Sequence, residues 1–261
     1  MKYAGMLENR YAMILGADTS IGWAIAQLFA KHYAKVAVVA APCVSHGAKV
    51  AASMSASESS QCDVYGDVNI RVFKSHMAPT EMAGLCAEVL SVFPYVDILV
   101  NATDYYPQTT PSTDPPVSSL KIPLQCSVGE LREILDVNFN CAVRCFQELL
   151  PGMLERRRGE VILFAPSDAQ SASVAARVCA GAITSFARNV THDYIRYRVR
   201  ANAAIYPSAG TANAEDDAND VNAVDDACAQ DAANAALWYA CDLSRFVLGE
   251  NLKLRGGMPV I

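Results

Sequence analysis

A short glycine-containing turn near the N-terminus, in the segment LGADTSIG, has residue types that could bind a nucleotide. An apolar run ends at Gly16, and a helical pattern opens before Gly22. A strand–turn–helix of this kind directs backbone N–H groups and the positive end of a helix toward a pyrophosphate. Ser20 stands where a middle glycine would allow the closest approach, and the Asp18 carboxylate would repel phosphate. The turn therefore predicts either a nucleotide site at Gly16, Ser20, Ile21 and Gly22 or a tight βα turn without a ligand.

Metal and disulfide chemistry have no comparable signal. The nine cysteines are scattered singly, with no Cys-x-x-Cys, and the four histidines share no metal-ligand spacing. An odd number of cysteines in an apolar chain indicates reduced, buried thiols. We predict no metal site and a reducing intracellular compartment, the cytoplasm by default, with the mitochondrion or another organelle as the alternative.

Composition and charge exclude several classes of protein. The chain has 261 residues, 52% of them hydrophobic and 18% charged, which excludes global disorder. No apolar run approaches the length of a membrane span, so none is expected. Eight acidic residues and no Lys or Arg lie between Ala201 and Ser244, while the remainder is near neutral. This distribution does not indicate nucleic-acid binding. The first strand is expected near Tyr11, which leaves no room for a long cleavable presequence.

Strand-length apolar runs alternate with helical patterns, which predicts βαβ units and a parallel sheet. The expected strands are Tyr11–Gly16, Lys35–Ala40, Ile70–Phe73, Val96–Asn101, Glu160–Phe164, Val199–Ile205 and Gly249–Leu254. The expected helices are Ser20–Tyr33, Thr80–Phe93, Gly129–Glu155, Ser173–Tyr194 and Cys228–Cys241. Right-handed crossovers then require a doubly wound, mainly parallel α/β sheet with helices on both faces. We predict one Rossmann-like domain over 1–261, with a Pro-rich loop at 102–128 and an acidic loop at 207–227.

Five segments, in their order and spacing, resemble the short-chain dehydrogenase/reductase family over nearly the whole chain: LGADTSIG, DILVNATD, LDVNFN, RVRANAAIYP and LGENLKLRGGM. The stretch NATDYYP is also similar to the pteridine-reductase branch. The resemblance implies hydride transfer between a nicotinamide and a carbonyl or imine. In that family a Tyr hydroxyl exchanges the proton, a Lys one helical turn later lowers the Tyr pKa, a Ser orients the substrate and an Asn positions a water.

The chain departs from this catalytic pattern. No Tyr is followed four residues later by Lys. Counting back from the RAN segment at 200–202 places Ala176 at the Tyr position and Ala180 at the Lys position. A phenol without a nearby cation is a poor acid–base group at neutral pH. The sequence therefore predicts that the usual proton-transfer pair is lost.

The other two catalytic positions are partly retained. The Ser position falls near Pro166, with Ser167 next to it as a candidate substitute. Asn138 is kept, either for the family's role or as part of a local helix distortion. Tyr105 and Tyr106 follow the fourth strand, nearer to where a nicotinamide would lie, but without a nearby Lys we interpret them as surface or packing aromatics.

The cofactor contacts are also degraded. The second strand runs into Ala40-Ala41-Pro42-Cys43, which offers neither an acid for the NAD ribose nor a base for the NADP phosphate. His46 and Lys49 lie nearby in sequence and could serve NADP weakly. Asn101 is retained, but Asp104 replaces a glycine and narrows the site. We predict no cofactor, or NADP if any, with Gly16, Ser20, Ile21, Gly22 and Asn101 as vestigial contacts.

Two hypotheses of function follow. The one we favour from sequence is a catalytically degenerate, non-enzymatic structural or accessory subunit of a larger assembly. It would contact other protein subunits, as a homo- or hetero-oligomer, through the helices at 129–155 and 173–194. The alternative is an NADP-dependent short-chain reductase of a carbonyl or pteridine-like substrate with atypical catalytic residues. A module that binds a nucleotide without reducing anything is a third option.

Overall fold

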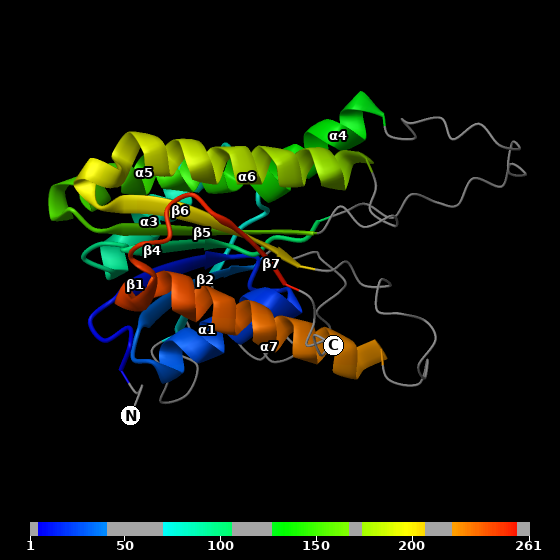
Figure 1. Cartoon of the computed structure of the whole chain (residues 1–261). Helices are drawn as coiled ribbons and strands as arrows, with labels where there is room; N and C mark the ends of the chain where they lie inside the picture. The colour runs from blue at the N-terminus through cyan, green and yellow to red at the C-terminus, as the bar shows by residue number, and fades with distance from the viewer. Residues whose placement is uncertain (1–4, 41–69, 106–126, 167–173, 207–220, 255–261) are drawn as a thin grey trace, which may run out of the picture.

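A seven-stranded parallel sheet forms the centre of the protein in the computed structural model (Figure 1). The structure describes residues 5–40, 70–105, 127–166, 174–206 and 221–254, with the backbone alone over 221–226. The strands are β1 (Tyr11–Leu15), β2 (Lys35–Ala40), β3 (Ile70–Lys74), β4 (Ile98–Asn101), β5 (Gly159–Pro166), β6 (Val199–Tyr206) and β7 (Asn251–Lys253). Each described strand pairing is parallel, so the predicted α/β fold is confirmed.

The strand order is β3-β2-β1-β4-β5-β6-β7, which reverses direction between β1 and β4. The pairing of Leu15 with Asn101 brings the carboxyl ends of these two strands side by side. Ligands of open α/β sheets bind outside the carboxyl ends of the strands at such a reversal. The topology therefore places the glycine turn and the segment after β4 at the edge where a ligand site is expected.

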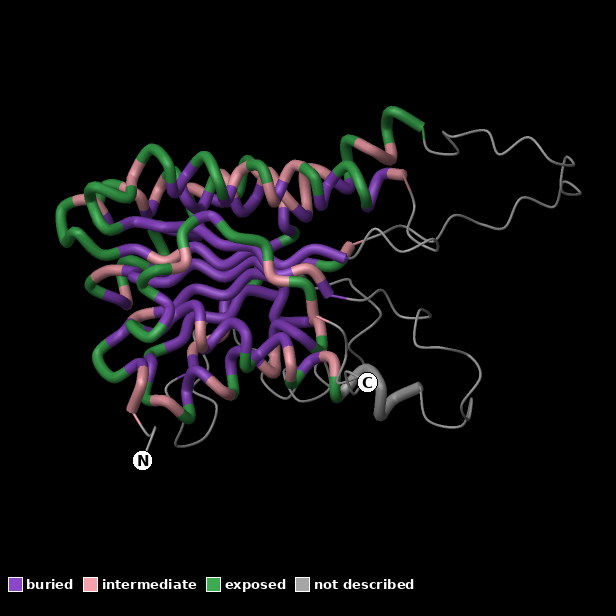
Figure 2. Tube along the Cα trace, in the orientation of Figure 1, coloured by how far each residue is buried: buried purple, intermediate pink, exposed green. Residues whose placement is uncertain are grey.

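Helices cover both faces of the sheet (Figure 1). On one face lie α1 (Ser20–Lys31) and α7 (Val221–Ala240), and on the other lie α3 (Met82–Val92), α5 (Cys141–Arg156) and α6 (Val174–Tyr194). Successive side chains of a strand point to opposite faces. Met13 thus packs in the core under α3, α5 and α6, whereas Ile14 packs in the core under α1 and α7. The strands are buried almost continuously, as Figure 2 shows, which is typical of a sheet covered on both faces.

Several predicted boundaries differ from the structure. The acidic loop expected at 207–227 is helical from Val221, because α7 begins seven residues before the predicted Cys228. Alanines in this stretch favour helix, which outweighs the loop-like Asp and Asn content. The strand predicted from Gly249 begins at Asn251, since Gly249 has a φ of +74° and lies outside the extended region. Residues 106–126 of the Pro-rich loop and 207–220 of the acidic loop lie outside the described residues.

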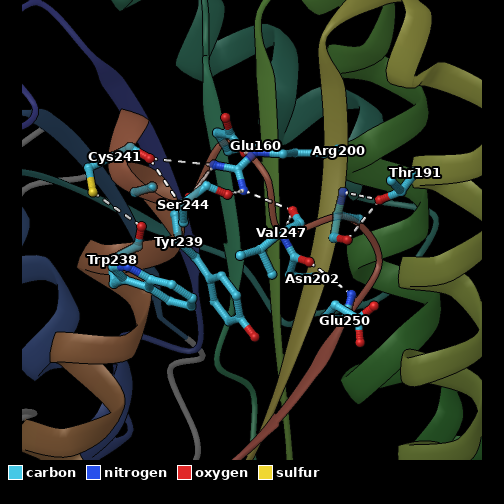
Figure 3. Close-up of polar contacts among 12 residues, drawn as sticks. Glu160, Thr191, Arg200, Asn202, Trp238, Tyr239, Cys241, Ser244, Val247 and Glu250 are labelled. Carbon is cyan, nitrogen blue, oxygen red and sulfur yellow. Dashed lines mark hydrogen bonds and ion pairs between the residues drawn. The ribbon is translucent and has the colours of Figure 1, made fainter.

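A buried cluster at the amino ends of β5 and β6 joins the C-terminal segment to the sheet (Figure 3). Arg200 Nε lies 2.6 Å from Glu160 Oε2, and the same guanidinium donates to the carbonyl oxygens of Ser244 at 2.6 Å and Tyr239 at 2.8 Å. Burial raises the pKa of Glu160 to about 7, although the positive charge of Arg200 opposes the shift. This cluster lies at the amino ends of the strands, whereas the candidate site is expected at their carboxyl ends. The cluster therefore stabilises the fold and takes no part in the candidate site.

Within the described residues, no helix has the length and apolar character needed to cross a bilayer.

Candidate functional site

The β1–α1 turn requires glycine at two positions. Gly16 has a φ of +79°, and a Cβ there would lie 2.6 Å from the backbone of Ala102 and Thr103. A Cβ on Gly22 would lie 2.1 Å from the Gly16 carbonyl oxygen. Real Cβ atoms do not approach backbone this closely, so any larger residue must displace the turn from β4 or from its own helix.

Thr19 fastens this turn, a role the sequence analysis missed. It is the N-cap of α1, and its Oγ1 accepts a hydrogen bond from the Gly22 N–H at 2.9 Å. The same hydroxyl lies 2.8 Å from the Gly16 carbonyl oxygen and 3.1 Å from that of Ala102, and it can donate to either. Thr directly before an apolar helical pattern is an N-cap signal, so the sequence held the clue. The backbone N–H groups of Ser20 and Ile21 lie in the first turn of α1, where an α-helix offers them no acceptor. They point outward beyond the N-terminal end of the helix.

Asn138 lies in a π-helical turn, η1 (Asp136–Asn140), between α4 (Val128–Leu135) and α5. Its backbone carbonyl accepts from Asn101 Nδ2 at 2.7 Å. Its side chain binds the backbone of Tyr105 twice, accepting from the N–H at 2.9 Å and donating to the carbonyl oxygen at 2.6 Å. Thr103 Oγ1 donates to Asn101 Oδ1 at 2.9 Å. The structure thus brings Asn101 and Asn138 together, and the helix distortion fixes the segment after β4.

A small crevice of roughly 260 Å³, including its open mouth, lies where β1 and β4 end. Its lining combines the glycine turn, the segment after β4, one residue after β3 and one from η1: Gly16, Asp18, Thr19, Met77, Thr103, Asp104, Tyr105 and Val137. Two carboxylates face this space, that of buried Asp18 and that of exposed Asp104. The described lining contains three hydroxyl side chains and no Lys, Arg or His.

Tyr105 is the phenol of this crevice, and its hydroxyl donates to the Glu133 carboxylate of α4. The hydrogen bond to Glu133 raises the Tyr105 pKa, and burial adds to the shift. A catalytic phenol needs the opposite shift, toward neutral pH. Loss of the Tyr105 proton would also place two negative charges side by side, so Tyr105 is a poor proton donor in this arrangement.

The two alanines of the expected dyad lie one turn apart on α6. Ala176 is 4% exposed and Ala180 is 8% exposed, and both belong to the buried apolar surface of the helix. Neither methyl side chain can transfer a proton. Ser167 lies outside the described residues, as do His46 and Lys49.

The crevice can be tested for its fit to a dinucleotide. The backbone of the turn fits, because the two required glycines and the free first-turn N–H groups form the arrangement that holds a pyrophosphate. The carboxylates of Asp18 and Asp104 oppose binding by repulsion. The backbone therefore suits the ligand while two side chains lower its expected affinity. When bound, a nicotinamide dinucleotide supplies hydride-transfer chemistry.

Comparison with known proteins agrees with this geometry. The sequence model of the enoyl-(acyl carrier protein) reductase family matches residues 16–259. The chain therefore belongs to the short-chain dehydrogenase/reductase family of oxidoreductases, whose members typically bind NAD or NADP.

Similar proteins span the whole chain. Momilactone A synthase of Oryza sativa subsp. japonica is 27% identical, covering 99% of this chain and 93% of the relative. The 3-oxoacyl-(acyl-carrier-protein) reductase FabG of Escherichia coli strain K12 is 23% identical, covering 97% and 99%. The fold matches a crystal structure of a short-chain dehydrogenase/reductase from Burkholderia xenovorans with a TM-score of 0.70, at 23% identity and with 98% of each chain covered.

These findings correct the function favoured from sequence. The similar proteins are named as synthases, dehydrogenases and reductases, and none is named as a non-enzymatic accessory subunit. The inference from lost side chains was wrong because it counted the proton donor and the side-chain contacts of the cofactor, whereas a glycine turn of this kind binds a dinucleotide mainly through its backbone. The reductase alternative agrees better with the family and with the retained turn.

Proposed function

We propose that this protein is an NADP-dependent short-chain reductase that acts on a carbonyl or imine compound, pteridine-like substrates included, without the usual Tyr–Lys pair. The observation that carries the proposal is the crevice at the β1–β4 reversal, with a glycine turn whose backbone suits a pyrophosphate. Membership of an oxidoreductase family supports it.

Described residues of the chain would bind the cofactor and shape the crevice. Gly16 and Gly22 keep the backbone close enough for the first-turn N–H groups to bind phosphate, and Thr19 holds that turn against β4. Asn138 fixes the segment after β4 that forms the opposite wall. Protons for a carbonyl substrate would come from water, which lowers the expected rate relative to a phenol–lysine pair.

The preference for NADP rests on the end of β2, where Ala40 is followed in sequence by no acidic residue before His46 and Lys49. An acidic side chain at this position would select NAD by binding the ribose diol. We therefore expect NADPH to bind more tightly than NADH.

The test is a titration of NADPH and NADH, followed by nicotinamide fluorescence and by thermal shift, together with reduction assays on ketones, aldehydes and cyclic imines. Gly22→Ala should weaken cofactor binding, because its Cβ would lie 2.1 Å from a backbone oxygen. Gly152→Ala is the matched control, since a Cβ there has open space within 4 Å. Absence of NADPH binding at millimolar concentration, with no turnover on any substrate, would contradict the proposal.

Two further expectations belong with this proposal. A reducing compartment, by default the cytoplasm, suits the six described cysteines, none of which forms a disulfide. Formation of a homo- or hetero-oligomer through the helices at 129–155 and 173–194 stays a prediction, checked by light scattering of the purified full-length protein.

A further inference from the structure

We infer that one end of the molecule binds the surface of an anionic phospholipid bilayer, through five exposed arginines and two exposed apolar side chains among them. We call this surface the arginine patch. Its members lie within the described residues: Arg156, Arg157, Arg158, Arg196 and Arg198, with Ile195 and Tyr197. The patch is separate from the crevice, so the inference does not depend on the reductase activity.

Two segments far apart in sequence form the arginine patch. The first is the turn between α5 and β5, and the second is the 3-10 turn η2 (Ile195–Tyr197) with the residue that leads into β6. Arg157 Nη2 donates to the carbonyl oxygen of Arg196 at 2.9 Å, and the Gly159 N–H donates to that of Arg198 at 3.2 Å. These bonds hold the two turns side by side, so the arginines form one surface.

The arginine patch lies at the opposite end of the sheet from the crevice. The strands are parallel, and the patch directly precedes β5 and β6, whereas the crevice lies where β1 and β4 end. Figure 1 shows α5 and α6 ending together at the amino ends of the strands. A bilayer bound at this end leaves the crevice open to water.

Most of the patch arginines have no charged partner of their own in the described structure. Arg156 Nε lies 3.7 Å from Asp97 Oδ1, and a cation in the last turn of α5 also stabilises that helix. Among the described residues, no carboxylate forms a salt bridge with Arg158, Arg196 or Arg198. Three guanidinium groups of the arginine patch are therefore available to an anionic partner.

The positive field of the patch reaches the protein interior. Burial lowers the pKa of Arg10, which is 2% exposed, and the positive charge of Arg158 adds to the shift, while Asp97 opposes it. The exposed carboxylates nearest to the patch in sequence are Glu155 and Asp193. They are fewer than the five arginines, so an anionic surface relieves repulsion that the described protein leaves in place.

The apolar side chains favour a lipid surface over other polyanions. Ile195 is 38% exposed and Tyr197 is 40% exposed, and they flank Arg196 in one turn. Apolar and aromatic side chains beside basic ones are typical of surfaces that enter the headgroup region of a bilayer. A net charge of -6 and a pI of about 5.2 disfavour nucleic acid. An acidic protein is the remaining alternative, which the experiment separates.

The experiment measures binding of the full-length protein to lipid vesicles by sedimentation. One set of vesicles is pure phosphatidylcholine, and the other also contains about a third phosphatidylserine. Each arginine near an anionic surface raises affinity about five-fold. We expect binding to the anionic vesicles to be about a hundred-fold tighter at low salt, with a smaller ratio at high salt.

Charge variants assign the binding to the arginine patch. The test variant removes the arginines without a salt bridge: Arg158→Gln, Arg196→Gln and Arg198→Gln. The matched control removes the same charge from exposed positions of α4, α5 and α6: Arg132→Gln, Arg144→Gln and Arg188→Gln. We expect the test variant to lose about a hundred-fold in affinity for anionic vesicles and the control about three-fold at most.

A second variant keeps every arginine and serves if the charge variant fails to fold. Ile195→Ser combined with Tyr197→Ser should lower affinity for anionic vesicles about three-fold at both low and high salt, because salt does not screen the apolar contribution. Circular dichroism spectra check that each variant is folded. Unchanged affinity in the double variant would overturn the role of these two side chains.

The outcomes decide between the possible partners. Equal affinity for anionic and neutral vesicles overturns the inference, as do equal losses in the test variant and its matched control. Binding of a polyglutamate peptide, measured by fluorescence anisotropy, without binding to anionic vesicles assigns the patch to an acidic protein and also overturns it. A preference for anionic vesicles that the test variant loses and the control keeps supports the inference.

Discussion

Asn138 holds both backbone polar groups of Tyr105, accepting from its N–H at 2.9 Å and donating to its carbonyl oxygen at 2.6 Å. The contact joins a π-helical turn to the segment after β4, across 33 residues of sequence. Asn138 is 1% exposed, so water cannot easily replace either bond. One wall of the crevice therefore depends on a single amide side chain.

We expect Asn138→Ala to destabilise the protein by about 1–3 kcal/mol, because it leaves two partly buried backbone groups of Tyr105 without this partner. Urea denaturation followed by circular dichroism measures this loss. Asn189→Ala is the control, since the exposed Asn189 side chain donates to the carbonyl oxygen and the hydroxyl of Ser185, one turn earlier on the same helix. Equal effects of the two substitutions would show that the contact with Tyr105 contributes nothing specific.

Thr19→Ala should remove the N-cap of α1 and loosen its link to β4. The expected cost is about 1 kcal/mol, the usual value for loss of an N-cap. Thr19→Ser keeps the hydroxyl and should retain most of the stability. We also expect weaker NADPH binding in Thr19→Ala than in Thr19→Ser, measured by fluorescence titration. If the two variants bind NADPH equally, the turn does not need this hydroxyl for its shape.

The fold could be predicted well from the sequence, because the fold depends on hydrophobic patterns that recur along the chain. The strand Lys35–Ala40 was predicted to the residue, since a short apolar run that follows a Lys and stops before Pro42 has one plausible interpretation. The start of α7 was missed because Asp and Asn favour loops locally, whereas the alanines of this stretch favour helix. The contact between Asn138 and Tyr105 could not be predicted, because it depends on a π-helical turn that periodicity does not specify.

The candidate site shows the same division. Gly16, Gly22 and Asn101 were identified from their motif, and the structure brings them to one sheet edge. Thr19 and the Tyr105–Glu133 bond were missed, since the first needs the cap geometry and the second needs the position of α4. The predicted function was wrong because the missing Tyr and Lys side chains were given more weight than the retained backbone of the glycine turn.

Glu160 makes the stability of the scaffold depend on pH. Its pKa rises to about 7 in the folded protein from an ordinary value of 4.5, so the folded state binds more protons than the unfolded state between these values. The stabilisation from this group is fully present below pH 4.5 and is lost as pH rises toward 7. Glu160→Gln, which can still accept from Arg200, should flatten this part of the pH–stability profile. Exposed Glu155→Gln is the control and should leave the slope as in the wild type. An unchanged slope in Glu160→Gln would show that Arg200 keeps Glu160 ionised.

Asp104→Gly tests whether the crevice binds its dinucleotide less tightly than the turn allows. The substitution restores the glycine expected at this position of the family's pattern and removes a carboxylate from the lining. We expect NADPH affinity to rise about three-fold at low salt, with a smaller gain at high salt, because Asp104 is exposed and its repulsion is screened. Asp104→Asn removes the charge but keeps the bulk, so comparing the two variants separates repulsion from obstruction. A gain in Asp104→Gly alone would assign the effect to space, and equal gains would assign it to charge. If neither variant binds NADPH more tightly than the wild type, Asp104 does not oppose the cofactor.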